Sequence, residues 1–301
     1  MSMTQTIEAP RTRQARSADE RIQVLESLPF WGVHAACLLA FWTGVSWVAV
    51  ITCVLAYYIR MFGVTAVYHR YFSHRTYKTS RPVQFVLALL GTSAVQKGPL
   101  WWAAHHRHHH RYADTDQDIH PPTVKGFWWS HVGWILCNKY MATKMDAIRD
   151  FAKFPELRFL NRYHMLPPIA LGLGMTAFGW ILHHFAPSLH TSAAQMFIWG
   201  FCVSTTLLYH GTFTINSLAH VFGRRRFVTN DTSRNSLLLS LITLGEGWHN
   251  NHHRYPGSER QGFYWWEIDV THYILTAMSW MGLVWDLRKP PGFIYAEAEG
   301  A

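Results

Sequence analysis

Two long stretches without a charged side chain constrain this chain more than any other feature. Neither residues 31–59 nor residues 163–223 contain Asp, Glu, Lys or Arg. A helix of about 20 apolar residues crosses a bilayer, so each stretch has room for a hairpin of two spans. A buried soluble core would explain one such stretch but poorly explains two. The sequence therefore predicts an all-α integral membrane protein with four transmembrane helices in two hairpins. The spans are expected at residues 27–45, 48–68, 165–184 and 195–218.

The placement of Lys and Arg predicts the orientation of these spans. The two expected turns, "TGVSW" and "HHFAPSLHTSAA", contain neither residue, whereas the segments outside the hairpins hold nearly all of them. Because basic residues stay on the cytoplasmic side, both termini and the middle of the chain are expected there. The rest of the chain divides into a disordered tail (1–26), a helical cap (69–162 and 222–290) and a C-terminal tail (291–301). Residues 27–290 thus form one membrane domain.

Two further segments are predicted as helices of the cap. The apolar run 83–95 is too short to span a bilayer, which favours an interfacial or re-entrant helix. The stretch "MDAIRDFAKFPELRFLNRY" has the pattern of one amphipathic helix on the cytoplasmic side.

The 20 histidines of the chain fall into two populations, and nine of them form tight groups. Two groups have the spacing HxxHH, which directs three imidazoles to one region because positions i, i+3 and i+4 share a helix face. Asn216 and His220 are also four apart. His69 and His74 are five apart, so the chain is expected to bend between the end of the second span and His74. The nine grouped histidines are His69, His74, His106, His109, His110, His220, His249, His252 and His253.

Such a set of imidazoles predicts a metal centre at the cytoplasmic membrane surface. Neutral imidazole is the commonest metal ligand, and nine nitrogens exceed what one first-row ion uses, so two metals are expected. The four cysteines form no CxxC pair and lie outside these groups, which argues against zinc-finger and iron–sulfur sites. His105 and His108 fall on other helix faces and are interpreted as bystanders. Three other histidines, His183, His184 and His190, are expected on the opposite side of the membrane.

The groups "HRYFSH", "HRHHHRYADTDQDIH", "NSLAH" and "GEGWHNNHH", together with "GFWWSHVGWIL", resemble those of the membrane fatty-acyl desaturases, in particular the stearoyl-CoA delta-9 type. The resemblance covers about residues 28–290. It implies a di-iron centre held by the nine grouped histidines, with Asn216 contacting one iron through a water. It also implies a stem of four spans under a helical cap that carries the irons. One departure is Ile119, where the family usually has Pro.

The residues around the predicted ligands suggest supporting and substrate-binding roles. Carboxylates near the second group could hold the far nitrogens of the ligand rings, and His120 would join them. The resemblance places a bend of an acyl tunnel near Gln96, Trp102 and Thr212. Tunnel depth is hypothesised to depend on the second span, and basic residues of the cap could meet phosphates of a carrier. The supporting set is Asp114, Asp116, Asp118 and His120; the depth residues are Cys53 and Tyr57; the head-group residues are Arg75, Lys78 and Lys139.

The predicted reaction is O2-dependent desaturation of a saturated fatty acyl chain to a cis-monounsaturated product, of the acyl-CoA delta-9 type. Chains bound to glycerolipid or carrier protein remain open, as does a membrane hydroxylase of the same histidine-rich class. A metal transporter or sensor fits less well, because the spans have almost no ionisable groups. No flavin, haem or nicotinamide segment is present, so a separate donor, a ferredoxin or small cytochrome, must supply electrons. The basic cap would dock that donor or the bilayer surface; no nucleic acid partner is expected.

Overall fold

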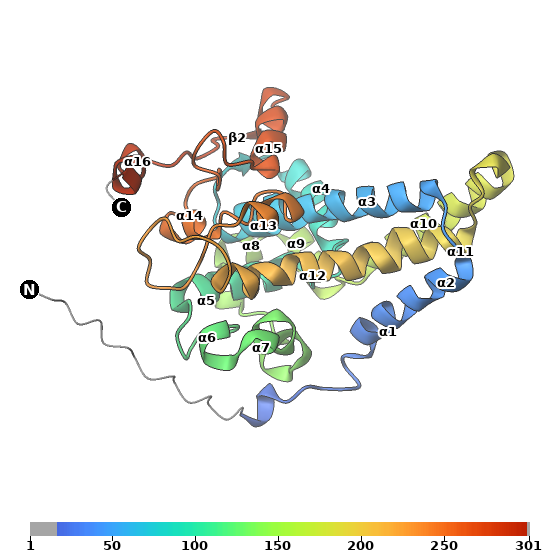
Figure 1. Cartoon of the computed structure of the whole chain (residues 1–301), viewed down its shortest axis with the longest axis horizontal. Coiled ribbons are helices and arrows are strands. Elements are labelled where there is room, and N and C mark those ends of the chain that lie inside the picture. The colour runs from blue at the N-terminus through green and yellow to red at the C-terminus, as the bar shows by residue number, and fades with distance from the viewer. Residues whose placement is uncertain (1–16, 300–301) are drawn as a thin grey trace, which may run out of the picture.

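A computed structural model describes residues 17–299 of this protein, and nearly all of its regular structure is helical. Long helices run side by side along the longest axis, and shorter helices gather at one end of them (Figure 1). We call the long helices the stem and the gathered short helices the cap. The stem consists of α1 (Leu28–Ala36), η2 (Cys37–Leu39), α2 (Ala40–Thr43), α3 (Trp47–Phe62), η3 (Gly63–Ser73), α10 (Leu166–Phe185), α11 (Ala193–Phe197), η8 (Ile198–Val203) and α12 (Ser204–Asn216).

The cap carries most of the remaining elements. Its helices include α4 (Arg81–Thr92), α5 (Pro99–Tyr112), α6 (Pro122–Lys125), α7 (Phe127–His131), α13 (Leu237–Ile242), α14 (His249–Arg254), α15 (Val270–Trp280) and α16 (Gly292–Glu299). One small antiparallel sheet joins β1 (Lys78–Thr79) to β2 (Val284–Trp285), pairing Lys78 with Trp285. This pairing fastens the end of the first stem hairpin to the C-terminal part of the cap.

The first stem hairpin turns where the sequence predicted, at "TGVSW". Helix α2 ends at Thr43, and Gly44 follows with φ of +69°, a conformation that favours glycine. Ser46 then caps α3, because its hydroxyl accepts a hydrogen bond from the amide of Ala49. Gly44 thus ends the first helix of the hairpin, and Ser46, two residues later, begins the second.

The second hairpin is formed by α10 and by the continuous helix α11–η8–α12, and its elements pack on the first. Helix α10 contacts α11, while α3 contacts both η8 and α12. A glutamine joins the two turns at the far end of the stem. Gln195 Oε1 accepts from Ser46 Oγ at 2.6 Å, and its Nε2 donates to the Thr43 carbonyl at 3.0 Å. The two hairpins are therefore pinned at the end opposite the cap.

The segment predicted as one amphipathic helix over 145–163 is broken instead. Residues Met145–Ile148 form a 3-10 turn (η6), α8 spans Arg149–Ala152, and a new helix, α9, covers Pro155–Arg162. Proline lacks the amide proton needed inside a helix and restricts the preceding residue to extended conformations. Phe154 has ψ of 114°, so the helix has to restart at Pro155.

The structure describes part of each predicted tail. Residues 17–26, expected to be disordered, run along the cap: Ile22 bridges Cys137, and the Glu20 carboxylate binds the ammonium groups of Lys125 and Lys139 at 2.6 and 2.8 Å. At the other end, α16 forms a helix whose Ile294 is buried. Residues 1–16 and 300–301 of the predicted tails lie outside the described residues.

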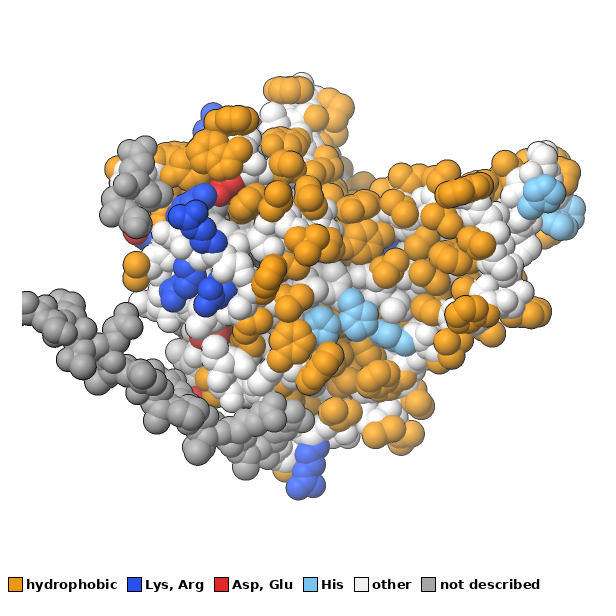
Figure 2. All heavy atoms as spheres, viewed as in Figure 1, with side chains coloured by type: hydrophobic (Ala, Val, Ile, Leu, Met, Phe, Trp, Pro, Cys, Tyr) orange, Lys and Arg blue, Asp and Glu red, His pale blue; other side chains and the backbone are white. Residues whose placement is uncertain are grey.

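The stem is markedly apolar on its surface. Two helical stretches, Trp47–Ser73 and Leu166–Phe185, are long and apolar enough to cross a membrane, and Leu28–Thr43 is a shorter apolar helix. Phe41 is 91% exposed and Trp47 is 83% exposed. Figure 2 shows hydrophobic side chains covering the stem, while Lys and Arg gather over the cap. Exposed apolar surface on this scale marks contact with lipid or another protein.

Candidate metal centre and substrate cavity

The two HxxHH groups lie on α5 and α14, and each helix divides its three rings between two clusters. Successive residues of an α-helix are 100° apart. Position i+4 is therefore rotated by about 40° from position i, whereas position i+3 is rotated by about 60° in the opposite direction. The structure follows this rule in both helices. His106 and His110 enter one cluster and His109 the other; His249 and His253 enter one cluster and His252 the other. Three rings in one region, as predicted, thus become two rings plus one.

His69 and His74 reach the same cluster through an unusual helix, not through the predicted bend. Residues Gly63–Ser73 form a π-helix, and the amide of His74 donates to the carbonyl of His69 at 3.2 Å, the i to i+5 bond of that geometry. Because the turn is wide, residues five apart share a face. The two ring centroids are 4.8 Å apart. The π-helix therefore runs through residues 69–73 and ends directly before His74.

The first cluster contains five imidazoles whose ring nitrogens lie within 4.8 Å of one another. Its neighbouring Nε2 atoms face each other at 2.9 to 3.0 Å, from His74 to His106, His106 to His110, His110 to His252, and His252 to His69. The five members, taken from η3, the residue after it, α5 and α14, are His69, His74, His106, His110 and His252.

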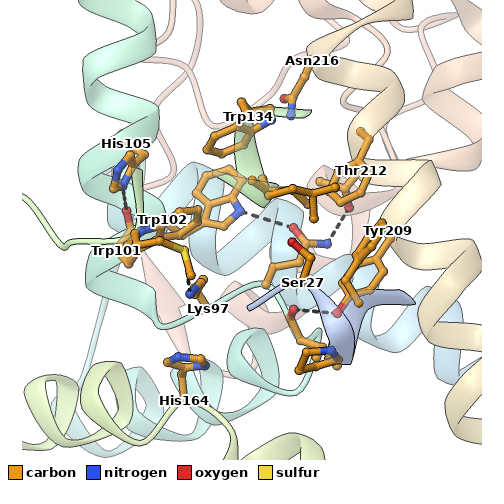
Figure 3. A pocket seen from close by; sticks show the side chains of 18 of the residues that line it. Ser27, Lys97, Trp101, Trp102, His105, Trp134, His164, Tyr209, Thr212 and Asn216 are labelled. Atoms are coloured by element: carbon orange, nitrogen blue, oxygen red, sulfur yellow. Dashed lines mark hydrogen bonds between the residues drawn. The ribbon is translucent and has the colours of Figure 1, made fainter. Parts of the chain in front are cut away.

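The second cluster contains four imidazoles, again with nitrogens within 4.8 Å. His249 Nε2 faces His220 Nε2 at 3.1 Å, and the clusters adjoin, since the rings of His110 and His253 are 4.6 Å apart. Its members are His109, His220, His249 and His253. Asn216 ends α12, four residues before His220, and its side chain lines the adjoining cavity (Figure 3).

Carboxylates hold the outer nitrogens of several rings. Asp118 bonds Nδ1 of His109 at 2.9 Å, and Asp114 bonds Nδ1 of His220 at 3.1 Å. These two residues belong to the predicted supporting set. Such contacts fix the ring and leave Nε2 directed inward.

Two more supporting carboxylates come from distant segments and were missed. Asp231 bonds Nδ1 of His253 at 2.8 Å, and Glu246 bonds Nδ1 of His69. Glu246 also contacts the guanidinium of Arg70, which is buried and additionally binds Asp269 at 2.9 Å. Asp231 has no sequence signal. Glu246 lies within "GEGWHNNHH", but the histidine that it contacts, His69, is far from it along the chain.

The other members of the predicted supporting set are placed differently. Asp116 is exposed, and the structure does not bring it to the rings. His120 is buried and stacks on His109 with centroids 4.4 Å apart. The bystander His108 donates from Nε2 to the carbonyl of Gln117, whereas His105 is buried against the carbonyl of Trp101 and is not a solvent group.

Electrostatics favour the neutral form of six clustered rings and the charged form of the supporting carboxylates; at His109 burial opposes protonation, but Asp118 and its neighbours raise the pKa. Burial and neighbouring imidazoles hold the pKa of His74, His106, His110, His249 and His252 well below the ordinary value. Burial also lowers the pKa of His253 to about 4, and Asp231 only partly offsets this effect. Burial raises the pKa of Asp114, yet hydrogen bonds from His220 and Thr232 bring it down to about 2. Neutral imidazoles are the form that binds metals.

The donor set fits metal ions better than it fits a protein core. The buried Nε2 of His253 and Nδ1 atoms of His249 and His252 have no hydrogen-bond partner in the described part of the chain. Buried polar atoms are rarely left so. With His253 Nδ1 occupied by Asp231, its Nε2 is free to bind an ion between the converging rings. Two adjacent all-imidazole clusters suit a pair of first-row metals, iron among them.

A cavity of about 480 Å³ adjoins the first cluster through His106. Trp102, whose ring stacks on His106 at 4.9 Å, donates to Gln96 Oε1 at 3.4 Å, and Gln96 Nε2 donates to Thr212 Oγ1 at 2.9 Å. Figure 3 shows these hydrogen bonds between residues that line the cavity. The three residues predicted for the tunnel bend therefore meet at one place in its wall.

The cavity extends along the inner face of one stem helix. Asn216, Tyr209 and Phe201 mark successive depths along α12 and η8, over roughly 20 Å at the usual helical rise. Phe30 and Val33 of α1 line it as well. The wall is mostly aromatic and aliphatic, which suits a long apolar chain.

The predicted depth residues lie elsewhere. Cys53 and Tyr57 are buried in α3 and are absent from the cavity wall; the Tyr57 hydroxyl donates to the carbonyl of Ile242 at 2.9 Å. The residues at that depth come from α1 and η8 instead, since α3 packs behind α12.

The predicted head-group cations are also separate from the cavity. Lys139 binds Glu20, Arg75 lies 3.7 Å from Asp150, and Lys78 lies 2.9 Å from Asp286. Of the described lysines and arginines, Lys97 lines the cavity, and burial lowers its pKa.

Comparisons with known proteins agree with this site. Residues 45–285 match the family model described as fatty acid desaturase. The chain is 34% identical to "Delta-9 acyl-lipid desaturase 1" of Arabidopsis thaliana, covering 90% of this chain and 85% of that protein. It is 35% identical to "sn-1 stearoyl-lipid 9-desaturase" of Anabaena variabilis (91% and 97%) and 36% identical to "Acyl-CoA C20 Delta5-desaturase" of Anemone leveillei (86% and 80%). With its histidine clusters beside an apolar cavity, the chain belongs to the fatty acid desaturase family and is an oxidoreductase.

Proposed function

We propose that this desaturase introduces a cis double bond near the middle of a saturated acyl chain, at a di-iron centre held by the nine clustered histidines. The observation that carries the proposal is the contact of the cavity with His106, because a chain lying in the cavity passes directly beside the first cluster. His69, His74, His106, His110 and His252 would hold one iron. His109, His220, His249 and His253, with Asn216 through a water, would hold the other.

The irons, when bound, supply the oxidising power that removal of hydrogen from an unactivated methylene requires, with O2 as the oxidant. The protein contributes the remainder. Asp114, Asp118, Asp231 and Glu246 hold the ligand rings through their outer nitrogens. The apolar wall excludes water from the reacting carbons.

Positioning of the chain determines where the double bond forms. An acyl chain has no chemical handle near its middle, so the wall has to hold one carbon pair beside the cluster. The hydrogen-bonded chain Trp102–Gln96–Thr212 supplies a rigid bend at that level. Phe201 and Tyr209 would set how much of the chain fits beyond it.

Two variants distinguish the depth residues proposed here, Phe201 and Tyr209, from those predicted from the sequence, Cys53 and Tyr57. Phe201→Ala is expected to accept saturated chains two carbons longer, because truncation deepens the cavity. Tyr57→Ala, the matched variant on α3, should leave the chain-length preference unchanged. The opposite pattern, with Tyr57→Ala alone changing the product profile, would return the tunnel end to α3.

We further propose that the chain is presented as part of a glycerolipid. Coenzyme A carries several phosphate charges and calls for several cations, whereas Lys97 is the one lysine or arginine in the described cavity wall. Lys125 and Lys139 of the cap are both held by Glu20. Acyl-CoA is the second candidate, because a relative at 36% identity bears the name acyl-CoA desaturase.

Four spans and a cytoplasmic active site complete the proposal. Support comes from the exposed apolar surface of the stem and the basic residues over the cap. A separate ferredoxin or small cytochrome would bring electrons to the cap.

The test is expression in a host that lacks its own desaturase, followed by gas chromatography–mass spectrometry of the fatty acids. A product lighter by two hydrogens with a cis bond at carbon 9 is expected; a product heavier by one oxygen would mean a hydroxylase. Purified enzyme with a donor system is then given labelled stearoyl-glycerolipid or stearoyl-CoA. Conversion of the CoA ester alone would refute the glycerolipid assignment while leaving desaturation intact.

A further inference from the structure

Three histidines outside the metal clusters form a hydrogen-bonded chain on the side of the stem. His34 lies on α1, His210 on α12 and His131 on α7. His34 Nε2 lies 3.1 Å from His210 Nε2, His210 Nδ1 lies 3.0 Å from His131 Nε2, and His131 Nδ1 lies 2.9 Å from Ser217 Oγ. His210 is exposed where the cap helix α7 packs on α12, and His131 is buried, so the chain leads inward from this junction of cap and stem. Figure 2 shows histidine side chains among the hydrophobic ones on this face.

This arrangement differs from a metal site. The middle ring, His210, directs one nitrogen to each neighbour, so the nitrogens follow one another and do not converge on a point. No carboxylate or cation within residues 17–299 forms an ion pair with any of the three rings. Their surroundings are aromatic: Trp31, Phe127, Trp128, Tyr209 and Phe213.

Counting protons along the chain shows that it can hold one more than its neutral state. The carbonyl of Phe30 only accepts, so His34 Nδ1, 2.7 Å away, carries a proton. When Ser217 donates to the carbonyl of Phe213 at 2.8 Å, His131 Nδ1 must carry one too. Each of the two nitrogen–nitrogen contacts needs one further proton. The three rings then hold four protons, one more than three neutral imidazoles, and together form a single cation. When the Ser217 hydroxyl turns to donate to His131, every contact is satisfied by neutral rings.

The inner end of the chain meets the segment that supports the metal centre. Ser217 directly follows Asn216, and its carbonyl accepts from the amide of His220 at 3.2 Å. Phe213 lies between the chain and the cavity: its ring lines the cavity and contacts His131 at 5.8 Å and His210 at 6.1 Å. The chain of histidines thus approaches the centre behind the cavity wall, apart from the space for the acyl chain.

The reaction needs such a route. Desaturation converts an acyl chain, O2, two electrons and two protons into the unsaturated chain and two waters; two hydrogens leave the acyl chain, and two protons come from solvent. A site that excludes water has no bulk source for them. Ionisable groups within a membrane protein characteristically mark such paths. Resting on the proposed desaturase function, we propose that His34, His210, His131 and Ser217 form a proton relay that delivers solvent protons to the side of the metal centre beside Asn216.

The test compares His210→Gln with His184→Gln in purified full-length enzyme in lipid nanodiscs. Both positions are exposed histidines on stem helices, but His184 hydrogen-bonds the carbonyl of Trp180 and touches the rings of Trp180 and His183, all on its own helix. His210→Gln is expected to reduce product formation roughly tenfold, release part of the consumed O2 as hydrogen peroxide, and keep its iron. In His210→Ala, added imidazole should restore the rate. His184→Gln should match the unmodified protein.

A second measurement does not depend on turnover. In iron-free protein with 15N-labelled histidine, a scalar coupling across the hydrogen bond between His210 Nδ1 and His131 Nε2 is expected and should disappear in His210→Gln. Equal rates, equal peroxide and no imidazole response in the His210 variants would overturn the relay. A lack of unsaturated product from the unmodified protein would instead overturn the proposed function.

Discussion

Two sets of histidines in this molecule have similar nitrogen–nitrogen distances but opposite surroundings. In the metal clusters, facing Nε2 atoms lie 2.9 to 3.1 Å apart, and Asp or Glu holds the outer nitrogen of four rings. In the His34–His210–His131 chain the spacing is 3.0 to 3.1 Å, but the outer partners are a carbonyl and a hydroxyl. A carboxylate fixes the ring and its tautomer, whereas a hydroxyl can reverse its bond. Convergence of the nitrogens, together with a carboxylate behind four of the rings, therefore separates the metal clusters from the chain, and the spacing does not.

Removal of one clustered ring gives the largest expected effect. His253→Ala should reduce the iron content from about two per chain to about one and abolish unsaturated product, because the second cluster loses one of its four imidazoles. A purely structural histidine would leave the iron content unchanged. Metal analysis of the purified protein and fatty-acid analysis of the host give the two results. His108→Ala is the control, because this ring lies on α5 outside both clusters. Full iron and full activity in His253→Ala would break the distinction between the two sets.

Removal of the carboxylate behind that ring tests the distinction itself. Asp231→Asn keeps a hydrogen-bond partner for His253 but loses the charge, and such changes typically weaken metal binding by about 10- to 100-fold. Competition with a chelator measures the affinity. Asp116→Asn removes an exposed carboxylate and should have no effect. Equal losses in both variants would indicate a general effect of charge.

Acid should destabilise the metal-free protein through the clustered rings before it affects the carboxylates. The pKa of His253 is lowered from 6.5 to about 4, so the unfolded chain binds a proton that the folded chain refuses between these values. Stability is then lost as the pH falls from about 6.5 towards 4, and Asp114, with a pKa of about 2, adds its loss only below about 4. Melting temperatures of iron-free protein at pH 7.5, 5.5 and 4.5 test this order. A melting temperature that stays constant down to pH 4.5 would contradict it.

The smallest effect is expected at the wall between the two regions. Phe213→Leu replaces the aromatic ring between the cavity and His131 with a smaller side chain. The change should cost on the order of 1 kcal/mol of stability. If the histidine chain is kept apart from the acyl space, the variant should release slightly more peroxide per product. Thr206→Val, on the same helix outside the cavity wall, is the matched control. Unchanged peroxide in Phe213→Leu would show that this ring is not the barrier.

Sequence reasoning reached those parts of the site that depend on local spacing. The HxxHH groups, the turn at Gly44 and the meeting of Trp102, Gln96 and Thr212 were all expressed in short patterns or in the family resemblance. The break at Pro155 had a visible signal that the amphipathic pattern obscured. Local rules could not identify Asp231 as the partner of His253, because that pairing depends on how α14 packs in the folded cap.

The same limit applies to the side of the stem. The sequence placed the depth residues on α3 because Cys53 and Tyr57 are one turn apart. Whether they reach the cavity depends on how the helices pack, and α1, not α3, faces the cavity side of α12. His34, His131 and His210 are each unremarkable in sequence and acquire a shared role only when three helices bring them together.

The wide turn of η3 has a consequence in genetic terms. Loss of one codon between His69 and His74 would leave them four residues apart, and an ordinary α-helix would still present both rings on one face. Arg70, buried against Glu246 and Asp269, would not keep its place, because narrowing the turn rotates it relative to the rings. The five-residue interval thus places the ligand pair and the buried arginine correctly at the same time. Insertions and deletions in "HRYFSH" should therefore be far less tolerated than substitutions at its aromatic positions, Tyr71 and Phe72.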